Sequence, residues 1–311
     1  MRLAVCVITF HRPIGLRRLL ESLNRQVFNI EDQGVHVFVV DNDANESARD
    51  ICHETTATLR WPLNYSVEKK RGISFARNTA VSAALKCSTP DFIAFIDDDE
   101  TAEPSWLEEL LAVQLQHNAD VVTGPIVSRL PSSTPQWIAS SRAFKSIRRE
   151  TGIIVDRAYT HNVLVRSAVF KTMKSWFDPR LALTGGEDSH FFRRAHNAGF
   201  KIVWADRAVA NEWIPESRAT AKWILQRAYR VGNSRVFIED DLRTSSILFF
   251  RLRILRQSAI RFVAGVALIF AGFFKGRSTI LEGLRTIYNG IGLLAGLAGR
   301  FYREYLYIHG E

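Results

Sequence analysis

The chain has 311 residues, of which 47% are hydrophobic and 23% are charged, a balance typical of a folded, core-forming protein and not of a disordered one. Its net charge of +9 lies in residues 218–311, which hold 15 Lys and Arg against 6 Asp and Glu, whereas residues 1–217 hold 26 of each. We therefore predict two parts, an α/β domain in residues 1–217 and a basic, apolar helical module in residues 218–311.

The first hundred residues alternate apolar strands with helices. Strands are expected at residues 3–10, 35–40, 63–67 and 92–96, with helices at 14–26, 47–54 and 73–86. This alternation predicts a mostly parallel, Rossmann-like sheet with helices on both faces. No GxGxxG motif follows the first strand, so a dinucleotide-binding site has no support.

Four consecutive acidic residues, Asp97, Asp98, Asp99 and Glu100, follow the strand at residues 92–96. If the chain stays extended, Asp97 and Asp99 leave on one side and two carboxylates converge at the carboxyl edge of the sheet, where α/β sheets bind ligands. Adjacent carboxylates repel one another, and Mg²⁺ or Mn²⁺ with phosphate oxygens would compensate them. The alternative is a solvated acidic turn.

The remainder of the α/β domain is less regular. We expect a helix at 104–115, a strand at 119–127 broken at Gly124-Pro125, a loop at 131–152, strand patterning at 161–170, a helix at 189–197 and a strand at 201–205. Glu187 and Asp188 stand just before the helix at 189–197. The helix dipole favours carboxylates there, so capping is an alternative to a catalytic role for this pair.

Five motifs in this order resemble those of the family 2 glycosyltransferases with the GT-A fold. They are Thr9-Phe10-x-Arg12, Asp41-Asn42-Asp43, Gly72-Ile73-Ser74-x-Ala76-Arg77-Asn78, Asp97-Asp98-Asp99-Glu100 and Gly185-Gly186-Glu187-Asp188. The resemblance covers residues 1–220, and the last motif is most similar to that of bacterial exopolysaccharide enzymes of the succinoglycan type. It implies a GT-A catalytic domain that transfers a sugar from a nucleotide sugar.

The resemblance implies a role for each motif residue. The residues around the nucleotide sugar are Thr9, Phe10, Arg12, Asp41, Asp43, Arg71, Arg77, Asp97 and Asp98. Within this set Asp41 is expected near the base, and Arg71 and Arg77 near the diphosphate or the ribose. Asp188 is expected to be the catalytic base, with Glu187 beside it.

The expected metal ligand is Asp99, which would bind a divalent ion that bridges the diphosphate. Many family members carry a metal-binding or diphosphate-binding His at a later position, where this chain has Glu212. Glu212 is therefore either a second metal carboxylate or a structural residue. Arg218 is either a clamp for an acceptor or diphosphate group or an ordinary surface arginine. We assign no catalytic or binding role to His11, His161, Trp204 or Trp213.

The basic module interleaves arginines with long apolar runs, with helices expected at residues 220–237, 247–274 and 279–307. The uncharged stretches of the last two have 13 and 14 residues, short of the roughly 20 that a spanning helix needs. This pattern favours a helical hairpin in a membrane interface over nucleic-acid binding. The alternatives are packing on the catalytic domain, on a second copy of the chain, or a short transmembrane hairpin.

The expected location is the cytoplasmic face of the inner membrane, with peripheral or monotopic attachment. Three cysteines without a CxxC motif are consistent with reduced thiols, and no secretory signal is expected. The resemblance implies a nucleotide-sugar donor, UDP before GDP or TDP, and a lipid-linked saccharide acceptor. Two alternatives remain: a non-catalytic nucleotide-sugar-binding scaffold, and a DxD phosphatase of the haloacid dehalogenase type, against which the ending of the first strand in Thr9-Phe10 counts.

Overall fold

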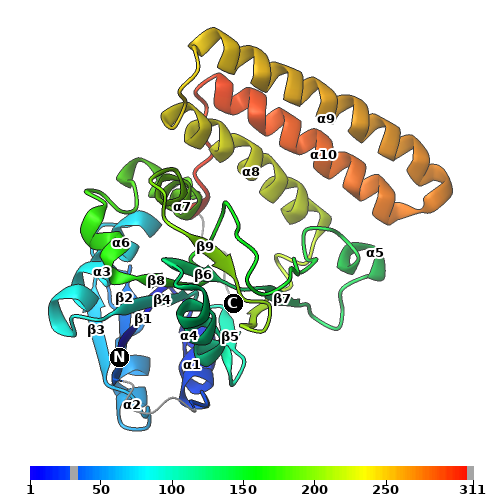
Figure 1. Ribbon diagram of the computed structural model, residues 1–311. Helices are drawn as coiled ribbons and strands as arrows, with labels where there is room; N and C mark the ends of the chain where they lie inside the picture. Colours follow the sequence, from blue (N-terminus) through cyan, green and yellow to red (C-terminus); the bar gives the residue numbers. More distant parts are fainter. Residues whose placement is uncertain (29–33, 307–311) are drawn as a thin grey trace.

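The structure is a computed structural model that describes residues 1–28 and 34–306, and its centre is a seven-stranded sheet with the order β3-β2-β1-β4-β8-β6-β9 (Figure 1). The strands are β1 (Arg2–Thr9), β2 (Gly34–Asp41), β3 (Leu63–Val67), β4 (Phe92–Ile96), β6 (Val121–Thr123), β8 (Asn162–Arg166) and β9 (Ile202–Trp204). β8 runs antiparallel to its neighbours β4 and β6, and the other described strand pairs of this sheet are parallel. The predicted α/β architecture with a mostly parallel sheet is confirmed.

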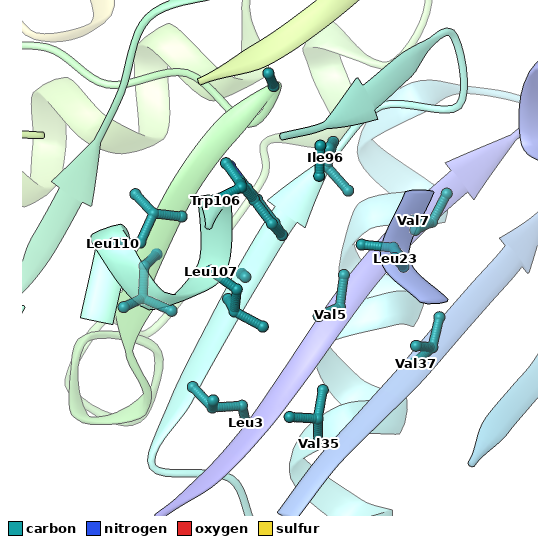
Figure 2. Close-up of a cluster of buried hydrophobic side chains, with 14 of the residues drawn as sticks. Leu3, Val5, Val7, Leu23, Val35, Val37, Ile96, Trp106, Leu107 and Leu110 are labelled. Atoms are coloured by element: carbon teal, nitrogen blue, oxygen red, sulfur yellow. The ribbon is translucent and has the colours of Figure 1, made fainter. Parts of the chain in front are cut away.

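Helices cover both faces of this sheet because the side chains of its inner strands alternate between two apolar cores. Along β1, Leu3, Val5 and Val7 enter one core, and Ala4 and Cys6 enter the other. The first core lies under the helices α1 (Pro13–Asn24), α2 (Arg49–Thr56) and α4 (Trp106–His117). Figure 2 shows its side chains filling the space over β1, β2 and β4. The second lies under α3 (Ile73–Cys87), α6 (Ser167–Thr172) and α7 (Glu187–Asn197).

A second, three-stranded sheet was not predicted. It consists of β5 (Glu100–Ala102), β10 (Ala210–Trp213) and β7 (Ile126–Arg129), with β10 in the middle. In this sheet Glu212 lies opposite Glu100. The predicted strand at 119–127 is therefore two strands in two sheets, separated at Gly124-Pro125.

Two expectations for the middle of the chain need correction. The segment expected to be strand-like at 161–170 becomes helical after Arg166, because β8 ends where α6 begins. The loop expected at 131–152 contains a one-turn helix, α5 (Gln136–Ala139).

The basic module is a layer of three long helices, α8 (Ala221–Asp241), α9 (Ile247–Lys275) and α10 (Arg277–Leu297), above the sheet domain (Figure 1). α10 contacts both α8 and α9. The base of α8 is joined to the sheet domain where Trp223 stacks on Phe144 at 6.0 Å between ring centroids. The boundary between residues 217 and 218 stays a prediction.

The last helix is shorter than predicted. The pattern at 279–307 indicated one helix, but α10 ends at Leu297. Gly299 adopts a left-handed φ of 73°, and the N–H groups of Gly299 and Arg300 donate to the carbonyls of Gly296 and Ala295. This is the hydrogen-bond pattern of a Schellman motif, which ends a helix and reverses the chain. The following residues return to the sheet domain.

Candidate active site

A cavity of about 1010 Å³ lies between the carboxyl ends of the sheet strands and the underside of α8. Most of the residues that the sequence singled out line it: Thr9, Phe10, Arg12, Arg71, Arg77, Asp97, Asp98, Asp99, Glu187, Asp188, Glu212 and Arg218. The parallel register explains the gathering, because β1 pairs with both β2 and β4 and their carboxyl ends face the same edge.

The acidic run does not continue the extended geometry of β4. The N–H of Glu100 donates to the carbonyl of Asp97 at 3.1 Å, so the chain turns within the run. The expected alternation of side chains is therefore wrong. Asp98 turns toward the end of β1, where it accepts hydrogen bonds from Thr9 Oγ1 at 2.8 Å and from Arg12 at 2.9 Å.

Asp98 and Asp99 share Arg12 but differ in their electrostatic surroundings. Burial raises the pKa of Asp98 to about 6, against the opposing effect of Arg12. Burial acts in the same direction on Asp99, but the guanidinium groups of Arg12 and Arg218, each 2.9 Å from Oδ2, outweigh it and lower the pKa of Asp99. Asp99 is therefore an ionised carboxylate at the cavity wall.

Arg77 joins the acidic run to the Gly-Gly-Glu-Asp motif. It is 3% exposed, lies 3.1 Å from Asp97 Oδ1 and forms a second ion pair with Glu187 Oε1. Glu187 is itself buried. Asp188 is only half-buried at the cavity wall, and its Oδ1 accepts from the N–H of Ser189 at 2.6 Å. The two neighbouring acids thus have different surroundings.

Glu212 adds a further carboxylate from the second sheet. Burial raises its pKa, and the negative charges of Asp99 and Asp97 act in the same direction. Burial also raises the pKa of Glu100, which lies opposite in the ladder. The largest compensating positive charge at Glu212 is Arg227 of α8, a residue that the sequence reasoning missed.

Arg227 belongs to a row of α8 side chains that lines the cavity, together with Trp223, Arg230 and Ser234. Their spacing of three and four residues places them on one helix face. That spacing was visible in the sequence, but the helix was interpreted only as an amphipathic element of the basic module. α8 thus forms the roof of the site.

Three carboxylates of the cavity, Asp97, Asp99 and Glu212, are hard oxygen ligands of the kind that a divalent cation takes. Arg77 pairs with Asp97, and Arg12 and Arg218 pair with Asp99, so a cation would share these carboxylates with guanidinium groups. Another acidic group, Asp178, His190 and Asp241, has ligand atoms within 4.8 Å of one another but does not line the cavity. There Arg180 already bridges Asp178 and Asp241 at 2.6 and 2.7 Å, so a guanidinium supplies the compensating charge.

Asp41 and Asp43 do not line the cavity. Asp41 is fully buried, and its carboxylate accepts from the N–H groups of Asp43 and Ala48, at 3.0 and 2.7 Å, and from Tyr65 Oη at 3.1 Å. Asp43 lies 3.3 Å from His11. These carboxylates shape the loop after β2, and it is their neighbour Asn42 that lines the cavity. A base contact by Asp41 stays a prediction.

Several cavity residues had no functional assignment from the sequence. His161, Tyr159 and Trp204 line the cavity, and Tyr305 reaches it from beyond α10. Burial lowers the pKa of His161, although the charges of Asp97 and Asp188 oppose this. No local pattern marks these residues, because only the tertiary fold brings them to the motifs.

Comparisons with known proteins show which family the sequence matches. The sequence matches Glycosyl transferase family 2 over residues 4–174 and Glycosyl transferase family group 2 over residues 92–299. The succinoglycan biosynthesis protein ExoM of Rhizobium meliloti is 32% identical over 235 residues, 75% of this chain and 74% of that protein. A glucosyl-dolichyl phosphate glucuronosyltransferase of Haloferax volcanii is 25% identical over 252 residues, with 74% of each chain covered.

The fold also matches a solved structure. Residues 1–349 of S. aureus TarS in complex with UDP align with a TM-score of 0.52 at 18% identity, covering 97% of this chain and 93% of that one. This likeness supports the GT-A-like architecture. The chain therefore belongs to glycosyl transferase family 2 and is a nucleotide-sugar glycosyltransferase.

Proposed function

We propose that this protein is a membrane-associated, inverting glycosyltransferase. It transfers a sugar from a nucleoside diphosphate sugar, with UDP as the favoured nucleotide, to a hydroxyl of a lipid-linked saccharide in bacterial polysaccharide synthesis. The observation that carries the proposal is the meeting, in one cavity, of the acidic run, the Gly-Gly-Glu-Asp motif and several guanidinium groups. These are the groups needed to bind a diphosphate and to activate a hydroxyl.

Asp188 is the proposed base. An acceptor hydroxyl is a weak nucleophile, so a carboxylate at the cavity wall must take its proton as the new C–O bond forms. Glu187 is less suited to this task, because it is buried and paired with Arg77. A single base supports one in-line displacement, which inverts the anomeric carbon and gives a β-linked product from an α-linked donor.

The departing diphosphate needs positive charge. Arg12, Arg71 and Arg218 line the cavity and can supply part of it. Asp99, with Asp97 and Glu212, would hold Mn²⁺ or Mg²⁺, and the ion would act as a Lewis acid that stabilises the diphosphate leaving group. Arg77 keeps Asp97 and Glu187 in place between the two motifs.

The helical layer supports the proposed acceptor and location. α9 has 29 residues and is long and apolar enough to cross a membrane by length and composition, although the uncharged stretch within it has only 13 residues. Its exposed apolar side chains include Leu252, Val263, Phe270, Phe273 and Phe274. α10 packs along α9 and also against α8, which carries the arginines of the cavity roof. If α9 spanned the bilayer, α8 and its arginines would lie within the hydrocarbon core. We therefore place α9 in the plane of the cytoplasmic interface.

A lipid-linked acceptor fits this placement, because the catalytic cavity extends to α9. Phe249 and Arg253 of α9 line the same cavity as Asp188. The name of the Haloferax volcanii relative includes glucosyl-dolichyl phosphate, a lipid-linked sugar. A site roofed by a membrane-bound layer can receive such an acceptor from the bilayer surface.

The first test is release of the nucleoside diphosphate from UDP-, GDP- and TDP-sugars, with Mn²⁺, Mg²⁺ or EDTA. We expect metal-dependent release from one donor and a loss of about 10²–10⁴-fold in Asp188→Asn. Asp50→Asn, an exposed Asp on α2, is the matched control. Donor binding without any release, even with membrane extract as acceptor source, would favour the non-catalytic scaffold. Full activity in Asp188→Asn would remove Asp188 as the base.

A further inference from the structure

The chain after α10 returns to the active site. Residues 300–306, which we call the strap, run from the end of α10 past α7 (Figure 1). Asn233 of α8 fixes the start of the strap, because its side chain donates to the carbonyl of Arg300 at 2.8 Å and accepts from the N–H of Tyr302 at 2.9 Å. Asn233 is buried, so these two hydrogen bonds are shielded from solvent.

The middle of the strap is attached to both sides of the cavity. Glu304 forms an ion pair with Arg230 of the α8 roof at 3.3 Å. The N–H of the next residue, Tyr305, donates to the carbonyl of Leu183 at 3.0 Å, just before the Gly-Gly-Glu-Asp motif. Both Glu304 and Tyr305 line the cavity.

The far end of the strap reaches the opposite side of the site. Arg71, in the loop before α3, donates to the carbonyl of Leu306 at 3.2 Å. The same guanidinium lies over the ring of Phe10 at 4.7 Å. The strap therefore crosses from the α8 roof to the Phe10–Arg71 side of the cavity, where the sequence motifs predict the nucleotide.

Tyr305 faces the reacting groups. A Cβ added at Gly185 would lie 3.1 Å from Cε2 of Tyr305, so the ring packs directly on the glycine pair of the motif. Arg77, Asp97 and Asp188 all act electrostatically on its hydroxyl. A tyrosine of ordinary pKa is protonated at neutral pH, and burial raises the pKa of Tyr305 further, so the hydroxyl can donate a hydrogen bond.

We propose, on the basis of the function proposed above, that the strap closes over the bound donor and that the Tyr305 hydroxyl donates a hydrogen bond to the donor diphosphate. The strap lies across the cavity, so it must release for the donor to enter and for the nucleotide to leave. In its closed position the strap keeps water away from the anomeric carbon until the acceptor has bound.

The test uses the full chain with Tyr305→Phe and Tyr305→Ala, and Tyr288→Ala on α10 as the matched control. Calorimetry measures UDP binding, and product analysis measures donor hydrolysis against transfer. We expect Tyr305→Phe to weaken UDP binding by about tenfold, the usual effect of losing one hydrogen bond to a charged group. Tyr305→Ala should show the same weakening and also a severalfold rise in hydrolysis relative to transfer, while Tyr288→Ala resembles wild type.

Two results together would overturn the inference: Tyr305→Phe binds UDP normally, and Tyr305→Ala keeps the wild-type ratio of hydrolysis to transfer. The strap would then be a structural tether. If wild type consumes no donor and binds no UDP, the proposed function fails as well. An active wild type with unaffected Tyr305 variants refutes the strap alone, so the two failures are distinguishable. Tyr305→Phe keeps the ring on Gly185 and therefore tests the hydroxyl without disturbing the packing.

Discussion

Glu187 and Asp188 are adjacent acids in different environments, and helix geometry explains the difference. Successive residues of a helix point about 100° apart, so one can enter the core while the next faces the cavity. Glu187 points inward and meets Arg77, a buried cation that would be costly to leave unpaired. Asp188 stays at the wall. Sequence alone left capping and catalysis open for both, because the environment that separates them is tertiary.

His190, also on α7, makes a pH-dependent contribution to stability. It is 2% exposed, its Nε2 lies 2.8 Å from Asp241 Oδ2 at the end of α8, and the charges of Arg194 and Asp178 also act on it. Arg180 pairs with both Asp178 and Asp241. Burial lowers its pKa below the ordinary value of 6.5, although Asp241 opposes this. The neutral form is therefore favoured in the folded protein, and the unfolded chain takes up a proton first as the pH falls.

We expect the unfolding free energy of wild type, relative to His190→Gln, to be constant above about pH 7 and to decline as the pH falls below 6.5. Urea unfolding between pH 5 and 8 measures this difference. The unfolding free energy should keep decreasing until the pH reaches the lowered pKa of His190 in the folded protein. A difference that grows as the pH falls would show that Asp241 dominates and that His190 is charged in the folded state.

At the scale of elements, glycines allow α8 and α10 to cross closely. A Cβ on Gly292 of α10 would collide with the backbone carbonyl of Tyr229 and lie 3.0 Å from the N of Asn233. Gly290 faces α9 instead, and the nearest atom to a Cβ there would be Cβ of Arg261 at 3.3 Å. Gly292→Ala should therefore destabilise the protein by about 1–3 kcal/mol, whereas Gly290→Ala should change stability by less than about 1 kcal/mol. Urea unfolding compares them, and equal losses would contradict the close crossing.

The success of sequence prediction also differs by element. β1, β2 and β4 were placed to within one or two residues, because buried parallel strands form long apolar runs. β5 and β10 have three and four residues, too few for a period to show, so the second sheet was missed. In the site, the motif residues were predicted from the family resemblance. Arg227 and Tyr305 were not predicted, because only the folded chain brings them close to those motifs.

For the whole molecule, the three-helix layer has one face on the active site and another that is apolar. α8 roofs the cavity, α10 lies between α8 and α9, and α9 is outermost. The exposed fractions of Phe270, Phe273 and Phe274 are 64%, 72% and 92%. Exposed apolar faces of this kind mark interaction sites. Two coverings are consistent with it, a membrane or a second copy of the chain, and oligomerisation through these helices stays a prediction.

Vesicle binding decides between the two coverings. The net positive charge of residues 218–311 favours an anionic bilayer, because two identical positive modules repel each other. We expect wild type to sediment with vesicles containing anionic phospholipid, less so in high salt, and the triple change of Phe270, Phe273 and Phe274 to Ser to weaken binding by at least about tenfold. Ile14→Ser, an exposed apolar residue on α1, is the control. A dimer that forms without vesicles, and that the triple change dissociates, would instead assign the face to a second copy.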